Sequence, residues 1–154
     1  MYYQANSYEH TVSGHTTEEA AERITQVNKR NKKQTTYLKK DFKLPQMIGD
    51  LEQAEVVFVS WGSNKGPIEA ARNLLATDNI KSAFIHFSHV FPLDEKRVQQ
   101  LFKSHKRYIL VENNSTGQFG QLLRQQTGVT IDEKIIKFDG RPFYAEEIVA
   151  AVNK

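Results

Sequence analysis

Residues 55–60, Glu-Val-Val-Phe-Val-Ser, form a short run that is mostly apolar and rich in β-branched side chains. A run of this kind is typical of a strand that is covered on both faces. The apolar residues that follow it share one face of a helix, and they are Ile68, Ala71, Leu74 and Leu75. This stretch therefore predicts a buried strand that leads into a helix.

The same unit recurs three times at intervals of roughly 25 residues. Apolar runs at 82–87, 108–112 and 134–138 predict three further strands. The helical faces expected after them consist of Val98, Leu101 and Phe102, then Phe119, Leu122 and Leu123, and finally Ile148, Ala151 and Val152. Alternating strands and helices predict a three-layer α/β/α fold with a mostly parallel sheet, whose strand order the pattern leaves open.

Helix-end signals agree with this reading. Pro67 suits a first helical turn, and Asp94 with Glu95 complements the positive end of a helix dipole. Gly128 follows Thr127 at a position where a helix would end on a left-handed residue. These signals place helix boundaries next to three of the expected strands.

The region before this domain has a different character. We expect residues 1–48 to be a connector with extended and helical parts, and residues 49–154 to form the α/β domain. Thr16-Thr17-Glu18-Glu19 resembles a capping box, which predicts that a helix begins there. The helix has few apolar residues, and the basic stretch Lys29–Lys33 makes its burial improbable. Pro45 marks the expected end of the connector.

Composition excludes several functions. The chain has 154 residues and no cysteine, so it forms no disulfide and cannot by itself ligate an iron-sulfur cluster or a thiolate zinc site. Its net charge of +3 comes from residues 1–43, which hold eight Lys/Arg against five Asp/Glu. No aromatic and basic motif accompanies that charge, so nucleic-acid binding is not favoured. No apolar run approaches the ~20 residues of a membrane span, and we expect a cytoplasmic protein.

The loops after the four expected strands contain polar residues and glycines. In an open parallel sheet, ligands and partners approach the carboxyl ends of the strands. The loop 61–67 looks superficially like a phosphate cradle, but it lacks both the P-loop and the dinucleotide fingerprints, so turn geometry is the better reason for its glycines. Glu112, Asn113 and Asn114 could offer a base and amide donors, although bonding to loop backbone is favoured.

No catalytic or metal-binding set is expected within this chain. Alternation along a strand sends His86 and His89 to opposite faces, and no nucleophilic triad is present. Any chemistry is therefore expected to be shared with another chain. The candidate interface or anion-contact residues at the strand ends are Trp61, Ser63, Lys65, Gly66, Glu112, Asn113, Asn114, Gln118, Asp139 and Arg141.

Several sequence blocks occur in one order that resembles a known family. They are Trp61-Gly62-Ser63 with Lys65-Gly66-Pro67, Val111-Glu112-Asn113-Asn114 with Thr116-Gly117-Gln118, Leu122-Leu123-Arg124-Gln125 with Thr127-Gly128, and Asp139-Gly140-Arg141-Pro142-Phe143. With them the chain resembles the α subunit of 2-oxoacid:ferredoxin oxidoreductases, particularly the 2-oxoglutarate type. Glu9-His10 and Gly14-His15 also look like the family's segment there, but Thr11, Val12 and Ser13 replace its acidic and aromatic residues.

The resemblance implies an enzyme that uses thiamine diphosphate and Mg to decarboxylate a 2-oxoacid, reduces ferredoxin through a [4Fe-4S] cluster, and forms an acyl-coenzyme A. In that family the preceding domain of the same subunit binds the pyrimidine of the cofactor. The β subunit binds its pyrophosphate and carries the cluster. The present residues look like the transketolase carboxy-terminal type of domain, so we expect no cofactor bound by this chain alone and no activity in isolation.

Two alternatives stay open. The domain is either a regulatory module that binds an anion or metabolite through Lys65 and Arg141, or the equivalent domain of a pyruvate-type or transketolase-like thiamine enzyme.

Overall fold

The computed structural model describes residues 4–103 and 106–153. It divides into two compact units, residues 1–42 and residues 43–154, called unit 1 and unit 2 below.

Unit 1 contains a short hairpin and a long helix. Strands β1 (Glu9–His10) and β2 (Thr16–Thr17) pair antiparallel, and helix α1 spans Ala20–Lys40. The capping box expected at Thr16 is therefore wrong, because Thr16 belongs to β2. Its hydroxyl donates to the side chain of Gln4 at 2.5 Å, so it does not cap a helix.

The hairpin packs against α1 through an ion pair. Arg30 of α1 donates two hydrogen bonds to the Glu9 carboxylate, at 3.1 and 2.5 Å. Its guanidinium and the backbone amide of His10 lower the pKa of Glu9 from 4.5 to about 2. The basic stretch Lys29–Lys33 is exposed, as predicted.

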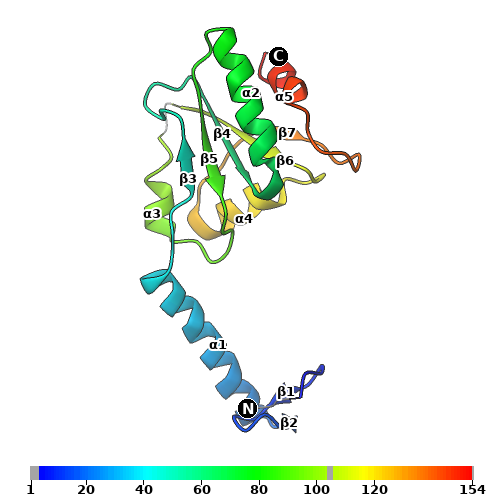
Figure 1. Ribbon diagram of the computed structural model, residues 1–154. Helices are drawn as coiled ribbons and strands as arrows, with labels where there is room; N and C mark the ends of the chain where they lie inside the picture. The colour runs from blue at the N-terminus through cyan, green and yellow to red at the C-terminus, as the bar shows by residue number, and fades with distance from the viewer. Residues whose placement is uncertain (1–3, 104–105, 154) are drawn as a thin grey trace. The chain divides into compact units, whose positions relative to one another are not determined.

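Unit 2 is built on a five-stranded sheet with the order β3-β5-β4-β6-β7 (Figure 1). Strands β4 (Val56–Trp61), β5 (Ser82–Phe87), β6 (Arg107–Glu112) and β7 (Glu133–Ile136) are parallel, which confirms the mostly parallel sheet. Strand β3 (Gln46–Ile48) pairs antiparallel with β5. It was not predicted, and it lies before residue 49, where we had expected the domain to begin.

Helices cover both faces of this sheet. Helix α2 (Lys65–Thr77), preceded by a 3₁₀ turn at Gly62–Asn64, lies beside α5 (Ala145–Val152) on one face, and α3 (Glu95–Gln99) and α4 (Gln118–Thr127) lie on the other (Figure 1). The three-layer prediction is confirmed. One core cluster joins the sheet to α2 and α5, and it includes Val56, Phe58, Ile68, Leu75, Ile109 and Ile148.

The helix ends follow the sequence signals closely. Asp94 accepts a hydrogen bond from the backbone N–H of Arg97 at 3.0 Å, and Gly128 ends α4 with φ of 74°. Two expected helical faces are partly wrong. Leu74 is exposed rather than buried, and Leu101 with Phe102 lies beyond α3, which has only five residues.

Candidate functional site

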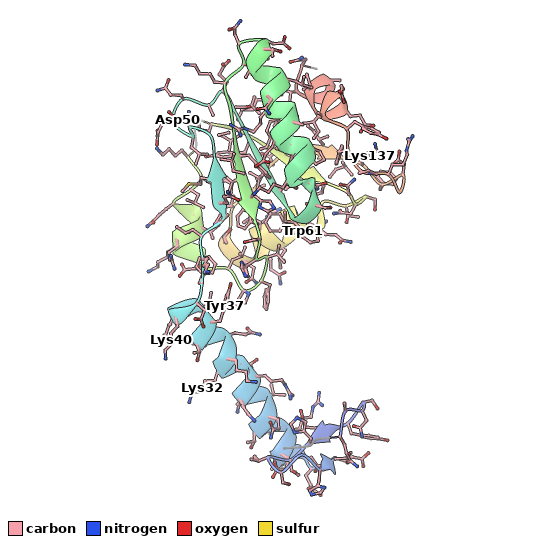
Figure 2. The ribbon with its side chains drawn as sticks, in the orientation of Figure 1. Lys32, Tyr37, Lys40, Asp50, Trp61 and Lys137 are labelled. Atoms are coloured by element: carbon pink, nitrogen blue, oxygen red, sulfur yellow. The ribbon has the colours of Figure 1, made fainter. Side chains whose placement is uncertain are left out.

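The loops that follow β4, β5, β6 and β7 lie at one edge of unit 2, because these four strands are parallel. We call this the carboxyl edge. Figure 2 shows Trp61 at this edge and Asp50, which follows the antiparallel strand β3, toward the opposite one. The strand order reverses at β4, since β5 lies on one side of it and β6 on the other. In open sheets, binding crevices form at such a switch point.

A cavity of about 470 Å³ opens at this switch point. Of the ten candidate residues, it brings together Ser63, Asn113 and Arg141. The rest of its lining consists of Asn64, Pro67, Lys137, Phe138, Gly140 and Pro142. The cavity thus joins the loops after β4, β6 and β7.

A buried polar network holds the wall of the cavity. Ser60, at the end of β4, donates to the backbone oxygen of Val111 at 2.6 Å. The side-chain amide of Asn64 donates to the Ser60 hydroxyl at 3.2 Å and to the same Val111 oxygen at 3.3 Å. Since satisfied buried networks are rigid, the turn after β4 is fastened to β6. Sequence reasoning did not single out Asn64.

Glu112 is fully buried at the end of β6 and serves the amino end of α4. Its carboxylate accepts from the backbone N–H groups of Phe119 and Gly120, both at 3.0 Å, and from the side-chain amide of Asn114 at 2.6 Å. These amides are among the donors that a helix start leaves unpaired, and a negative charge is favourable there. Glu112 therefore stabilises the amino end of α4.

The neighbouring amide side chains are also bonded within the chain. Asn114 accepts from the backbone N–H groups of Thr116, Gly117 and Gln118, the shortest of these bonds being 2.7 Å to Gly117. Asn113 donates to the backbone oxygen of Arg141 at 3.3 Å and so ties two strand-end loops together. Gln118 is the first residue of α4 and is exposed.

The candidate anion contacts do not share one site. Lys65 donates to the side chain of Gln46 at 2.9 Å, on the β3 side of the edge, and it does not line the cavity. Arg141 forms an ion pair with Asp139 at 2.5 Å, and this guanidinium lowers the pKa of Asp139. Lys137 lines the cavity but bonds Glu147 at 2.7 Å. The cations near the cavity are therefore neutralised within the chain.

The glycines of the first loop have different roles. Gly62 has φ of 62°, a left-handed conformation that glycine adopts at little cost, so turn geometry explains it. Gly66 lies inside α2 without a positive φ, and the expectation of a turn there is wrong.

His86 and His89 make contacts with neighbouring groups of the chain. His86 bonds the backbone oxygen of Gly62 at 3.2 Å, and His89 lies 3.1 Å from the hydroxyl of Ser88. Among the residues that the structure describes, no three His, Asp or Glu side chains gather in a way that could hold a metal ion.

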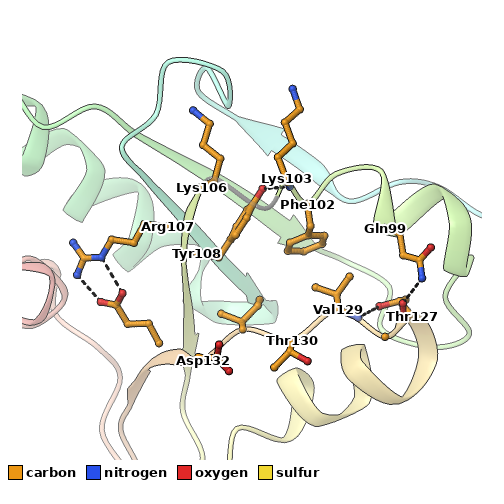
Figure 3. Close-up of a pocket in the computed structure, with 13 residues that line it drawn as sticks. Gln99, Phe102, Lys103, Lys106, Arg107, Tyr108, Thr127, Val129, Thr130 and Asp132 are labelled. Atoms are coloured by element: carbon orange, nitrogen blue, oxygen red, sulfur yellow. Dashed lines mark hydrogen bonds and ion pairs between the residues drawn. The ribbon is translucent and has the colours of Figure 1, made fainter.

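A larger cavity of about 610 Å³, which sequence reasoning missed, lies at the opposite edge (Figure 3). Its walls come from the ends of β6 and β7 that begin at Arg107 and Glu133, and these two residues form an ion pair at 2.5 Å. The rings of Phe102 and Tyr108 lie with centroids 5.0 Å apart in it. No periodic pattern links its residues, which come from 99–108 and 127–133, so the sequence carries no signal for it.

Aromatic side chains at the carboxyl edge were also missed. Phe91, Phe138 and Tyr144 have exposed fractions of 52%, 72% and 60%, and the candidate Trp61 has 41%. The sequence placed Phe138 inside a strand, but β7 ends at Ile136 and Phe138 lies in the following loop.

None of the helices in the described part of the chain is both long and apolar enough to span a bilayer.

Comparison with known proteins identifies the family. Residues 48–135 match the transketolase, C-terminal domain family. The chain belongs to this family. The match begins at Ile48, the last residue of β3, covers β4 to β6, and stops within β7.

Relatives of this transketolase-type domain agree with the resemblance drawn from the sequence blocks. The chain is 32% identical to 2-oxoacid:ferredoxin oxidoreductase 2, subunit alpha, of Aeropyrum pernix, over 95% of this chain and 23% of the relative. It is 31% identical to the crystallised alpha chain of a probable 2-oxoacid ferredoxin oxidoreductase from Thermoplasma acidophilum, over 71% of this chain and 94% of that one, with a TM-score of 0.50.

The fold of nearly the whole chain recurs in a solved enzyme. The 2-oxoglutarate:ferredoxin oxidoreductase of Magnetococcus marinus, solved with 2-oxoglutarate, coenzyme A and succinyl-CoA bound, matches 99% of this chain and 26% of its own, with a TM-score of 0.76 and 24% identity. This chain spans about a quarter of the length of that protein and of the Aeropyrum relative.

Proposed function

We propose that the chain acts as the carboxy-terminal domain of the α subunit of a thiamine-diphosphate-dependent 2-oxoacid:ferredoxin oxidoreductase. The similarity to an α subunit over 95% of the chain supports this assignment. We further propose 2-oxoglutarate as the substrate. The sequence blocks around residues 61–67 and 111–118, which resemble that type, support this choice, and the fold is shared with a 2-oxoglutarate enzyme.

The proposed role of this domain is packing and subunit assembly rather than chemistry. The observation that supports this role is that polar side chains at the carboxyl edge are bonded within the chain. Glu112 and Asn114 are bonded to the start of α4, while Lys137 and Arg141 are paired with carboxylates. General acid–base catalysis needs a group that can reach a reacting atom, and these groups are already engaged within the domain.

The residues present do not fit a site for the proposed enzyme's cofactors. The two cations near the 470 Å³ cavity are paired, so they offer little charge to a diphosphate. Iron-sulfur clusters are held by cysteine thiolates, and the chain has no cysteine. We therefore assign thiamine diphosphate, Mg and the [4Fe-4S] cluster to the proposed partners, which are the preceding pyrimidine-binding domain and a β subunit.

In this proposal the partners decarboxylate the 2-oxoacid, transfer its electrons to ferredoxin and form the acyl-coenzyme A. We place the assembly in the cytoplasm, and neither nucleic acid nor a membrane is among its proposed partners.

An activity assay tests the proposal. The purified chain and the assembly that contains it with the pyrimidine-binding domain and the β subunit are each supplied with coenzyme A, ferredoxin and either 2-oxoglutarate or pyruvate. We expect ferredoxin reduction only by the assembly, with 2-oxoglutarate preferred. Turnover by the chain alone would refute the assembly role, and a preference for pyruvate would replace the proposed substrate by the pyruvate-type alternative.

A further inference from the structure

Helix α1 of unit 1 carries a strong positive charge along one side. Between Glu22 and its last residue it holds seven Lys/Arg and no Asp or Glu. At 3.6 residues per turn, five of these cations fall within about a third of the helix circumference. We call them the basic stripe, and they are Lys29, Lys32, Lys33, Lys39 and Lys40. Figure 2 shows Lys32 and Lys40 on α1.

The basic stripe has no counter-charge in unit 1. Arg30 is paired with Glu9, but among the residues that the structure describes no ion pair or side-chain hydrogen bond involves an ammonium group of the stripe. A hollow of about 300 Å³ beside the stripe is lined by Lys29, Lys32, Lys33, Thr36, Tyr37 and Asp41. Its three lysines outnumber its one carboxylate, so the hollow keeps a net positive charge.

Helix α1 lacks the packed face that stabilises most helices. All of α1 is described by the structure, and Gln26 is its one buried residue. Lys29 lies three and four residues before Lys32 and Lys33, at the spacings where like charges repel. A surface of carboxylates laid on the stripe would remove this repulsion. It would also allow the lysines to be covered, because charges are buried only when they are paired.

Other covers match the stripe poorly. Residues 44–154 hold as many Lys/Arg as Asp/Glu, so neither unit 2 nor a second copy of it has an acidic excess. Ile24 is the one large apolar side chain exposed on α1, which is too little for insertion into a membrane surface. Nucleic-acid phosphates would match the charge, but no aromatic and basic motif accompanies it. A protein surface rich in carboxylates fits best.

The weakness of exposed ion pairs decides which protein supplies this surface. Each pair strengthens a contact by up to about five-fold, and salt screens it. Tethering in one chain strengthens a contact by about 10²- to 10⁴-fold without any new interaction. A surface in the same polypeptide therefore outcompetes an equally acidic surface on a separate subunit.

We propose that the basic stripe docks onto an acidic surface of the pyrimidine-binding domain that precedes this chain in the α subunit. This inference rests on the proposed function, which supplies that domain. Helix α1 is then a salt-sensitive fastening to the upstream domain.

Carbodiimide cross-linking of the complete assembly, followed by mass spectrometry of the peptides, identifies the cover. The reagent joins a lysine amine to a carboxylate that lies against it. We expect links from the stripe to Asp or Glu of the pyrimidine-binding domain in the same chain. Links to the β subunit, to unit 2 or to another copy, or no links from the stripe, would overturn the inference.

Hydrogen exchange of the α1 amides measures how firmly the stripe is held. In the wild-type assembly, exchange should be about 10- to 100-fold slower at about 20 mM salt than at about 0.5 M, because salt screens the ion pairs. In the purified chain the sign should reverse, since low salt strengthens the repulsion between the lysines. This comparison needs no substitution.

Charge reversal tests the stripe directly. In the assembly, Lys29→Glu/Lys32→Glu/Lys33→Glu should abolish the slow exchange at low salt. The matched control reverses three exposed lysines of unit 2, Lys81→Glu/Lys96→Glu/Lys134→Glu, and should exchange like the wild type.

The outcomes separate this inference from the proposed function. Exchange of α1 in the wild-type assembly that does not depend on salt overturns the docking but leaves the proposed function standing, since that function is judged by ferredoxin reduction. An α subunit without a pyrimidine-binding domain overturns both. Salt-sensitive binding of a DNA duplex or an RNA by the wild-type assembly, lost in the stripe variant, would assign the stripe to nucleic acid instead.

Discussion

Replacing Glu112 by glutamine should strongly destabilise unit 2. The carboxylate accepts three hydrogen bonds, from Phe119, Gly120 and Asn114, in a fully buried position. Glutamine has one carbonyl oxygen, and its NH₂ group would face a backbone N–H that needs an acceptor. A lost bond to a charged group costs about 1.5–3 kcal/mol, and the lost helix-end charge adds about 0.3–1 kcal/mol, so we expect about 3 kcal/mol.

Urea unfolding followed by the fluorescence of Trp61, the one tryptophan of the chain, measures this change. With a slope of about 2 kcal/mol per molar, the midpoint should fall by about 1.5 M. Glu146→Gln is the matched control, because Glu146 lies in the first turn of α5 but is exposed. If Glu112→Gln costs no more than the roughly 0.5 kcal/mol typical of a surface change, the proposed role of Glu112 is wrong.

Two further predictions concern other parts of the chain. Arg30→Ala should raise the pKa of Glu9 from about 2 toward 4.5, as measured by NMR titration. Because the folded pKa is the lower one, the pair stabilises unit 1 above pH 4.5 and this stabilisation is lost as the pH falls toward 2, so the variant should lose that acid dependence. An unchanged Glu9 pKa would contradict the pairing. Gly62→Ala should destabilise unit 2 by about 1 kcal/mol because of its left-handed backbone, whereas Gly66→Ala, inside a helix with open space around it, should stabilise it by up to about 1 kcal/mol. Chemical denaturation compares the two, and the same sign for both would refute the argument.

The parallel strands were predictable because each one is a run of apolar residues buried on both faces. The runs 55–60 and 82–87 agree with β4 and β5 to within one residue. Strand β3 has only three residues, and its pairing with β5 is a contact between distant parts of the chain. No local pattern of that length distinguishes a strand from a loop.

The candidate site was predictable in its place but not in its details. Parallel strands bring their ends to one edge whatever their order, so the loops around Ser63 and Asn113 were expected together. The roles of Glu112 and Asn114 depend on where the first amides of α4 lie in space, which spacing does not reveal. At Thr16 the spacing predicted a helix cap that does not form. Its hydroxyl donates to the side chain of Gln4 instead.

The short strand β3 has a consequence for how this domain must be handled. It pairs with the side of β5 that faces away from β4. The sequence of β5, Ser-Ala-Phe-Ile-His-Phe, is mostly apolar and carries no Asp, Glu, Lys or Arg. An uncovered strand of that kind is a template for adding strands from other molecules. A shortened protein starting at residue 49 would remove this cover and should form aggregates, so β3 protects the sheet against intermolecular pairing.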